Sequence, residues 1–296
     1  MAAESVVLES LPGTVNGLVR LALPSVPLVN KMPGVRKGHG FTPLAFSLPG
    51  AVPDKAHVDA YARVCGFALR DTLPITYPHM LAFGLHSAIL ASPQFPWPAM
   101  GLVHLTNSIT SHRPVGRGEE LHVSADLGQP QTHPKGTLLE FHTSVRSGDE
   151  LVWESSSGYL KRGKPTARTP EQAASAPDSG AQTSGGTGLP WRLGADLGRR
   201  YAAVSGDHNP IHLYPLTAKA LGFPRQIAHG MWSLAHCLAL VDNRLPRSCR
   251  IDAEFKKPIL LPSTVIWRHE GRGEQQEFSL RKADGSPHLI GSISAR

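Results

Sequence analysis

The sequence predicts an α+β protein built from two similar domains, each a long helix wrapped by a curved antiparallel sheet. Three observations predict it: a length of 296 residues, a polar Gly/Ser/Pro-rich segment in the middle, and the same order of elements on both sides of that segment. The length suits about two domains of ordinary size. Hydrophobic residues make up 41% and charged residues 18%, as in globular chains.

The composition argues against several classes of protein. No apolar run approaches the roughly 18 residues that span a bilayer, and the N-terminus lacks the basic and apolar regions of a secretory signal. The three cysteines, an odd number, predict a reducing, cytoplasmic location and no disulfide framework. Neither Cys-x-x-Cys nor His-Glu-x-x-His occurs, so we expect no metal site.

The net charge of +7 comes from 30 Lys and Arg against 23 Asp and Glu. These cations are scattered and have little aromatic interleaving, so we expect no nucleic acid partner. A modest positive surface suits a small polyanionic carrier instead, such as coenzyme A or a phosphopantetheine group.

The first domain is expected over residues 1–163, although the role of residues 1–40 stays open. A helix is predicted over His57–Val64, with Asp54 as its N-cap and Gly66 at its end. The nearly continuous apolar run Met80–Leu90 predicts a buried helix. Strands follow at Gly101–His112, Leu121–Leu127, Thr137–Arg146 and Leu151–Leu160, the last two joined by a tight turn at Gly148-Asp149.

Residues 164–188 are rich in Ala, Ser, Thr, Gly and Pro and predict a flexible linker. The second domain is therefore expected over residues 189–296. It begins at Leu189–Leu193. Helices are predicted at Gly198–Val204, Pro215–Leu221 and Met231–Val241, and strands at Ile251–Phe255, Ser263–His269, Gln276–Lys282 and His288–Ser294.

The two halves resemble each other in sequence, which indicates a duplicated domain rather than a solenoid. The segment Tyr61–Gly66 matches Tyr201–Gly206 at an offset of about 140, and His112–Val115 matches Lys256–Ile259 at a slightly larger offset. Beyond the first match the halves diverge. Phe67 stands where the second half has Asp207, and Thr72 stands where it has His212. The repeat thus predicts that only the C-terminal half keeps an acid–base pair.

That pair lies in the motif Asp-x-Asn-Pro-x-His, which runs from Asp207 to His212. Taken singly, the aspartate is typical of a turn and the histidine of a satisfied core position. Together, in a turn stiffened by Pro210, they can face one small space and hold a water between them. Asn209 is expected to shape the turn and His208 to point outward.

Gly230 follows His229 at the start of the apolar helix and allows two interpretations. It can be a glycine needed for close packing. It can also supply a backbone N–H at the positive end of the helix, which would stabilise an oxyanion.

These residues resemble the signature of the MaoC-like (R)-specific enoyl thioester hydratases and dehydratases, the hydratase 2 family. The signature covers Ser205–His212, Ala218, Gly222-Phe223 and Ile227–Met231. The resemblance implies a hot-dog fold for the C-terminal domain and a degenerate hot-dog for the N-terminal one. The segments Tyr77-Pro78 and Ala99–Pro114 resemble the double hot-dog 3-hydroxyacyl thioester dehydratases of actinobacteria.

The resemblance implies reversible hydration of trans-2-enoyl thioesters, carried by coenzyme A or acyl carrier protein, to (3R)-3-hydroxyacyl thioesters. It makes Asp207 and His212 the catalytic pair and gives the thioester carbonyl to the Gly230 amide. Ser205, Asn209 and His229 would support them. It requires no cofactor and no metal.

In the double hot-dog arrangement the acyl tail would run towards the N-terminal domain, along the apolar helix Met80–Leu90. Arg225, Lys256 and Lys257 are candidates for the phosphates of the carrier. Two hot-dogs in one chain already form the usual pair, and a further homodimer is possible. Two alternatives stay open: a non-catalytic acyl-thioester binding protein, and an acyl-CoA thioesterase. The Asp/His pair disfavours the first. The second usually needs a carboxylate on the central helix, and Met231–Val241 has none.

Overall fold

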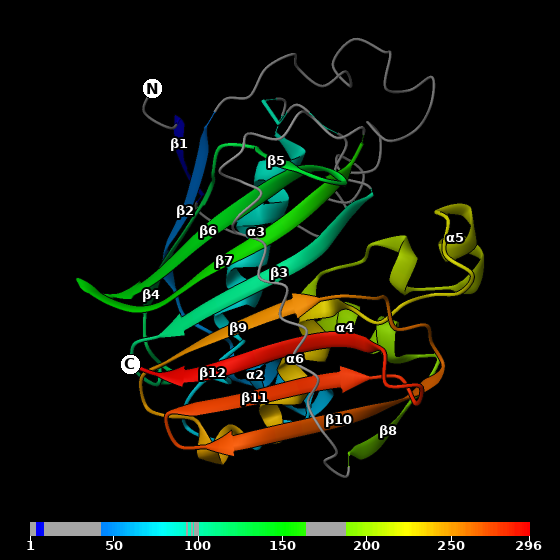
Figure 1. Ribbon diagram of the computed structural model, residues 1–296. Coiled ribbons are helices and arrows are strands. Elements are labelled where there is room, and N and C mark those ends of the chain that lie inside the picture. The colour runs from blue at the N-terminus through cyan, green and yellow to red at the C-terminus, as the bar shows by residue number, and fades with distance from the viewer. Residues whose placement is uncertain (1–3, 9–42, 93, 96, 98–100, 164–187) are drawn as a thin grey trace.

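The computed structural model describes residues 4–8, 43–92, 94–95, 97, 101–163 and 188–296 (Figure 1). Their strands form one 12-stranded sheet, whose strands follow the order β1-β2-β4-β6-β7-β3-β9-β12-β11-β10-β8, with β5 paired to β6 at one side. The helices α2, α3, α4 and α6 lie behind this sheet in Figure 1. The chain therefore folds as a double hot-dog of α+β class.

The first half contributes seven strands and two helices to the described structure. They are β1 (Glu4–Val7), β2 (Leu44–Ala51), α2 (Lys55–Cys65), α3 (Pro78–Ala91), β3 (Leu102–Ser111), β4 (Leu121–Leu127), β5 (Gln131–His133), β6 (Gly136–Ser147) and β7 (Glu150–Arg162). The long helix α3 packs against β2, β4 and β6.

The second half repeats this plan. Its elements are β8 (Leu189–Leu193), α4 (Leu197–Ser205), the 3-10 turn η4 (Pro210–His212), α5 (Pro215–Ala220), α6 (Gly230–Ala239), η5 (Asp242–Arg244), β9 (Cys249–Phe255), β10 (Ser263–Arg272), β11 (Gln275–Arg281) and β12 (Pro287–Ala295). The strand order β8-β10-β11-β12-β9 mirrors β2-β4-β6-β7-β3 of the first half. The duplication predicted from the sequence is thus visible in the sheet.

The two halves meet where β3 pairs with β9, antiparallel, from Thr106↔Glu254 to Ser111↔Cys249. Ser108 pairs with Asp252 at the centre of this seam. These two residues are separated by the same 144 positions that relate His112 to Lys256. Equivalent residues therefore face each other at the seam, as expected on a two-fold axis.

Local sequence explains how the short helices begin and end. The Asp54 side chain accepts a hydrogen bond from the His57 N–H and caps α2. Helices α2 and α4 both end at a glycine in the left-handed conformation, Gly66 with φ of 87° and Gly206 with φ of 73°. Only glycine adopts this backbone readily, so the repeated Gly fixes the same sharp turn in both halves.

The structure adds strands that the sequence pattern did not predict. Strand β2 carries Pro49 and Gly50, which interrupt its alternation, and β1 pairs with it in parallel. Of the predicted linker at 164–188, all but Gly188 lies outside the described residues, as do residues 9–42 of the N-terminal region. No helix in the described part of the chain is long and apolar enough to cross a membrane.

Candidate active site

The Asp207 turn follows directly from the left-handed end of α4. The Asp207 N–H donates to Ser205 Oγ at 3.1 Å, and the Asn209 N–H donates to Asp207 Oδ1 at 3.1 Å. Asn209 Oδ1 accepts from the Ile211 N–H at 3.4 Å and caps η4. The bond from Asn209 occupies Oδ1 of the carboxylate and leaves Oδ2 to face the cavity. The Asp207 side chain is 28% exposed.

His212 is buried, and one ring nitrogen is fixed by the backbone. Its Nδ1 lies 2.8 Å from the Ile227 carbonyl oxygen. A carbonyl only accepts hydrogen bonds, so Nδ1 carries the hydrogen and Nε2 keeps its lone pair when the ring is neutral. That Nε2 stands 4.0 Å from Asp207 Oδ2. The predicted acid–base pair is therefore brought together, with a gap too wide for a direct hydrogen bond.

His229 contacts both Asp207 and His212. Its Nε2 donates to the Asp207 backbone carbonyl at 2.9 Å. Its ring stacks on His212 with centroids 3.7 Å apart, and Tyr201 packs on its other side at 4.9 Å. The motif residues Ser205, Asn209 and His229 thus all contact the turn that presents Asp207 and His212. His208, expected to point outward, is half-buried and lines the cavity.

The environment sets the charge of the pair. Burial acts to raise the pKa of the Asp207 carboxyl, but the His229 and His212 rings and the Asn209 N–H outweigh it and hold that pKa below its ordinary value. Burial lowers the pKa of His212 below its ordinary value, against the opposing effect of Asp207. Burial and the adjacent His212 lower the pKa of His229 to about 3. At neutral pH the site therefore holds a carboxylate beside a neutral imidazole.

Gly230 begins α6 and lines the same cavity. As the first helical residue, it has an N–H without an acceptor inside the helix. A Cβ at this position would lie 3.1 Å from Phe255 Cε1, which is tighter than ordinary contact. The glycine therefore avoids a tight contact with Phe255, and its N–H has no acceptor inside the helix, so the two interpretations from the sequence are compatible.

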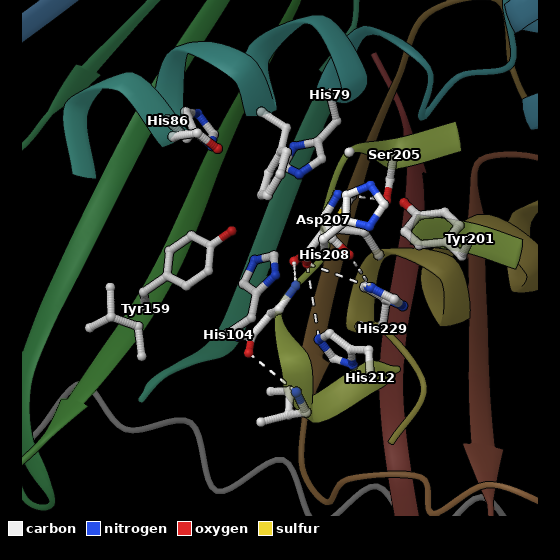
Figure 2. Close-up of a pocket in the computed structure, with 18 of the residues that line it drawn as sticks. His79, His86, His104, Tyr159, Tyr201, Ser205, Asp207, His208, His212 and His229 are labelled. Carbon is white, nitrogen blue, oxygen red and sulfur yellow. Dashed lines mark hydrogen bonds and ion pairs between the residues drawn. The ribbon is translucent and has the colours of Figure 1, made fainter. Parts of the chain in front are cut away.

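The cavity has a volume of about 1540 Å³ and extends from the Asp207 turn into the N-terminal half. Figure 2 shows polar side chains from that half pointing into it: His79 and His86 from α3, His104 from β3 and Tyr159 from β7. These residues were not predicted from the sequence, because His79 and His86 belong to a mainly apolar helix and His104 and Tyr159 belong to strands without a recognisable motif. The spacing of His79 and His86, seven residues apart on one helix face, was the signal available.

The predicted phosphate ligands separate into two groups. Lys256 and Lys257 line the cavity, and Lys256 Nζ pairs with Glu254. Arg225 is exposed and is not among the residues that line the cavity. Two further cations, Lys135 and Arg162, line the cavity from the N-terminal half. The positive charge around the cavity therefore comes from both halves.

Asp207, His212 and His229 each offer one ligand atom within 4.8 Å of the others, a donor set that transition metals accept. However, His229 Nε2 already donates its hydrogen to the Asp207 carbonyl. With His229 Nε2 engaged in this way, Asp207 Oδ2 and His212 Nε2 are the two atoms of the set that keep lone pairs towards each other, which favours a small hydrogen-bonding molecule between them over a three-coordinate ion.

Comparison with known proteins defines the class. The MaoC like domain family matches residues 181–288, which include the Asp207 turn, Gly230 and most of the second hot-dog. The fold and the site together define a double hot-dog protein with a MaoC-like second half.

A relative in Mycobacterium tuberculosis, 3-hydroxyacyl-thioester dehydratase X, is 33% identical over 292 residues, covering 95% of this chain and 98% of the relative. The crystal structure of that bacterium's HtdX superposes with a TM-score of 0.74 at 32% identity, covering 85% of this chain and 100% of the other. The (R)-specific enoyl-CoA hydratase of Aeromonas caviae is 35% identical over 78 residues, covering 25% of this chain and 58% of that enzyme. The chain belongs to the MaoC-like dehydratase family and is a hydro-lyase.

Proposed function

We propose that the chain catalyses the reversible syn hydration of trans-2-enoyl thioesters to (3R)-3-hydroxyacyl thioesters. Asp207 and His212 are the acid–base pair, and the Gly230 N–H binds the thioester oxygen. The observation that carries this proposal is the gap of 4.0 Å between Asp207 Oδ2 and His212 Nε2. Both atoms are hydrogen-bond acceptors at neutral pH, and they face the same cavity.

One water molecule fits this gap. Two hydrogen bonds of about 2.8 Å can meet at a single oxygen when their acceptors are about 4–5 Å apart. The water would donate one hydrogen to Asp207 Oδ2 and the other to His212 Nε2. Its lone pairs are then left to point into the cavity, towards the C3 carbon of a bound enoyl group. The Ile227 carbonyl supports this arrangement because it binds Nδ1 of His212 and so leaves Nε2 directed towards Asp207 Oδ2.

The chemistry balances without any further reactant. The water oxygen bonds to C3 as one water O–H bond breaks and its proton passes to the pair. The C2=C3 electrons move onto the thioester oxygen and form an enolate. The pair then returns a proton to C2 on the same face, and the enolate collapses to the thioester. A positioned acid or base contributes roughly 10²–10⁴-fold to such a step.

The Gly230 N–H stabilises the enolate oxygen. It lies at the N-terminal end of α6, where the unpaired amides and the helix dipole both favour negative charge. Its place beside Phe255 in the cavity wall puts it within the same chamber as the Asp207 turn.

The two halves divide the substrate between them. Residues 189–296 supply the chemistry, residues 1–163 receive the acyl chain, and residues 164–188 link them. The relatives are named as acting on 3-hydroxyacyl thioesters and enoyl-CoA, which supports a thioester of coenzyme A or acyl carrier protein here. Lys256, Lys257, Lys135 and Arg162 are the proposed contacts for the carrier's phosphates. A homodimer and a cytoplasmic location stay predictions.

Two alternative functions are less well supported. A thioesterase of this fold usually places a carboxylate on or near the central helix, whereas α6 presents Gly230, Met231 and Ser233 to the cavity. A binding protein without activity would have no need to hold a carboxylate and a bare imidazole nitrogen 4.0 Å apart.

The test is steady-state hydration of crotonyl-CoA and longer trans-2-enoyl-CoAs by the wild type, Asp207→Asn and His212→Ala. We expect kcat to fall by roughly 10²–10⁴-fold in each variant, because each removes one acceptor of the water. Thr72→Ala, at the matching place in the first half, is the control and should stay within about twofold of wild type.

Retention of wild-type turnover by either site variant would refute the mechanism. Saturable binding without conversion by the wild type would favour the binding protein. Release of free thiol from a saturated acyl-CoA would favour the thioesterase.

A further inference from the structure

Three buried histidines line the part of the cavity that lies in the N-terminal half. His79 and His86 come from α3, and His104 comes from β3 (Figure 2). Each has one buried ring nitrogen with no hydrogen-bond partner among the described residues: Nδ1 of His79, Nδ1 of His86 and Nε2 of His104. Buried polar atoms normally have partners, so three unpartnered ring nitrogens in this part of the cavity indicate that a ligand supplies the missing hydrogen bonds.

These histidines form a row that leads away from the reacting pair. His79 and His86 lie two helical turns apart on α3, and their rings meet edge-on with centroids 5.6 Å apart. The Asp207 charge acts on the rings of His79 and His104, whereas the ring of His86 is influenced by those two histidines. His104 is held between Tyr159 and Phe255, with ring centroids 4.4 Å and 4.8 Å from its own. All three histidines line the N-terminal part of the cavity, to which we assign the acyl chain.

All three rings are neutral at neutral pH. Burial lowers the pKa of His79 to about 4 and that of His104 to about 3, and it holds the pKa of His86 well below its ordinary value. The row therefore offers no charge to a carboxylate or phosphate. It offers hydrogen-bond donors and acceptors, which suit a neutral polar group.

The orphan atom of His104 has a defined character. Its ring hydrogen-bonds the backbone of Thr106, an interaction that raises its pKa and so identifies the ring as the donor. The orphan Nε2 is then a bare acceptor, which needs an O–H or N–H from the ligand. His86 Nε2 is already paired with Thr143 Oγ1 at 2.9 Å, so its Nδ1 points to a different partner. A plain alkyl chain would leave these nitrogens unsatisfied, whereas a hydroxyl both donates and accepts.

We propose that the cavity selects enoyl chains that carry a hydroxyl group beyond C3, bound by the row of His79, His86 and His104. This inference rests on the proposed hydratase function and adds its substrate class. His104 and His86 are specificity-determining residues in it: they hold the chain and take no part in the proton transfers.

The experiment measures kcat/KM for a panel of ten-carbon trans-2-enoyl-CoAs. One member is unsubstituted, and each of the others carries a single hydroxyl at one carbon from C5 to the chain end. We expect a hydroxyl at one or two adjacent positions to raise kcat/KM at least about tenfold over the plain chain, as one well-formed hydrogen bond supplies.

His104→Phe and His86→Leu are then run on the same panel. Phe keeps the stack on Tyr159 and Phe255 but removes both ring nitrogens. We expect the preference for the hydroxyl, measured as the ratio of kcat/KM values for the hydroxylated and plain chains, to fall about tenfold in each variant. The ratio within one preparation is independent of how much protein is folded. His142→Phe is the control, because His142 lies in β6 between the buried, inward Phe141 and Thr143 and is itself exposed.

The outcomes separate the two proposals. Normal turnover of the plain chain with no gain from a hydroxyl at any position overturns this inference and leaves the hydratase function intact. A gain that survives both variants also overturns it. Failure of the wild type to turn over any chain in the panel overturns the hydratase function, and the inference with it.

Discussion

The two halves of the chain share the same backbone turn after a helix but place different side chains in it. Helices α2 and α4 end in the same left-handed glycine, Gly66 and Gly206. The next residue is Phe67 in the first half and Asp207 in the second. Phe67 is buried with 6% exposure in the hydrophobic core, whereas Asp207 faces the cavity. The same backbone turn therefore places a buried packing group in one half and a carboxylate facing the cavity in the other.

The long helices differ in the same way at their first residues. Tyr77 precedes α3 and packs edge-on against Tyr61 at 5.4 Å, just as His229 precedes α6 and packs on Tyr201 at 4.9 Å. The first helical residue is Pro78 in α3 and Gly230 in α6. Proline has no N–H. The first half has thus lost the amide donor as well as the two side chains.

The space around the turn also differs. In the first half it is filled from α6: Trp232 Nε1 donates to the Val64 carbonyl at 3.0 Å, and His236 Nδ1 lies 2.7 Å from the Cys65 carbonyl. Counted from the helix starts, the matching residues of α3 are Met80 and Gly84, and both line the open cavity. A few side chains on a shared framework therefore decide whether a half holds a ligand or a packed core.

Among substitutions that exchange features between the halves, the largest effect is expected from placing the first residue of α3 at the start of α6. Gly230→Pro should lower kcat by about 10²–10³-fold, the usual effect of removing one oxyanion donor. Proline is well tolerated at the first position of a helix, so the fold should persist. Gly230→Ala is the matched control, because it adds the same Cβ beside Phe255 but keeps the N–H. Equal turnover in the two variants would show that the amide plays no part.

An intermediate effect is expected from placing a histidine of α3 in the cavity, as His236 of α6 fills the space around the turn of the first half. Gly84→His copies His236 and should lower kcat/KM for long enoyl-CoAs at least about tenfold, while crotonyl-CoA stays within about twofold. Gly84→Ala should have a much smaller effect on the same chain-length series. The melting temperature should not fall, since glycine inside a helix is the least favourable choice among residues other than proline. A uniform loss across all chain lengths would contradict the assignment of α3 to the acyl path.

The smallest effect concerns pH. The proposed mechanism needs Asp207 ionised and His212 neutral. The pKa of each is lowered in the folded protein, so both are in the required form above pH 6.5. Protonation of His212 Nε2 removes an acceptor, so kcat/KM should fall as pH drops below about 6.5. The loss should be no more than about tenfold at pH 5.5, because the ordinary pKa of histidine is about 6.5. A decline that begins above pH 7 would contradict the assignment.

The sequence predicted the framework well because the framework is local. The helices at His57–Val64 and Met80–Leu90 and the strands after them follow from hydrophobic periodicity and Gly punctuation, and all are present. The repeat also located the turn of Asp207 and His212, since a shared Tyr-Ala-x-Val-x-Gly can be aligned without any structure. The family resemblance then supplied the hot-dog fold, which the structure confirms.

The rest depended on contacts between distant segments. Which of 15 histidines are buried cannot be read from periodicity, so His104 was passed over, although it stacks on Tyr159 across the β3–β7 pairing. The strand β2 was missed because its order comes from its neighbours β1 and β4 rather than from its own pattern. The prediction that Arg225 binds the carrier's phosphates rested on its charge alone, and charge does not show whether a side chain reaches the cavity.

The pairing of Ser108 with Asp252 shows what joining the two halves permits. In a symmetric dimer of identical chains, a residue on the axis meets its own copy, so an aspartate there would oppose another aspartate. In this chain the two equivalent places carry different residues, and the hydroxyl of Ser108 hydrogen-bonds the carboxyl of Asp252 and helps to lower its pKa. Because the two halves belong to one chain, equivalent positions can carry different residues. The C-terminal half can then carry the proposed acid–base pair while the N-terminal half forms the proposed binding site for the acyl chain.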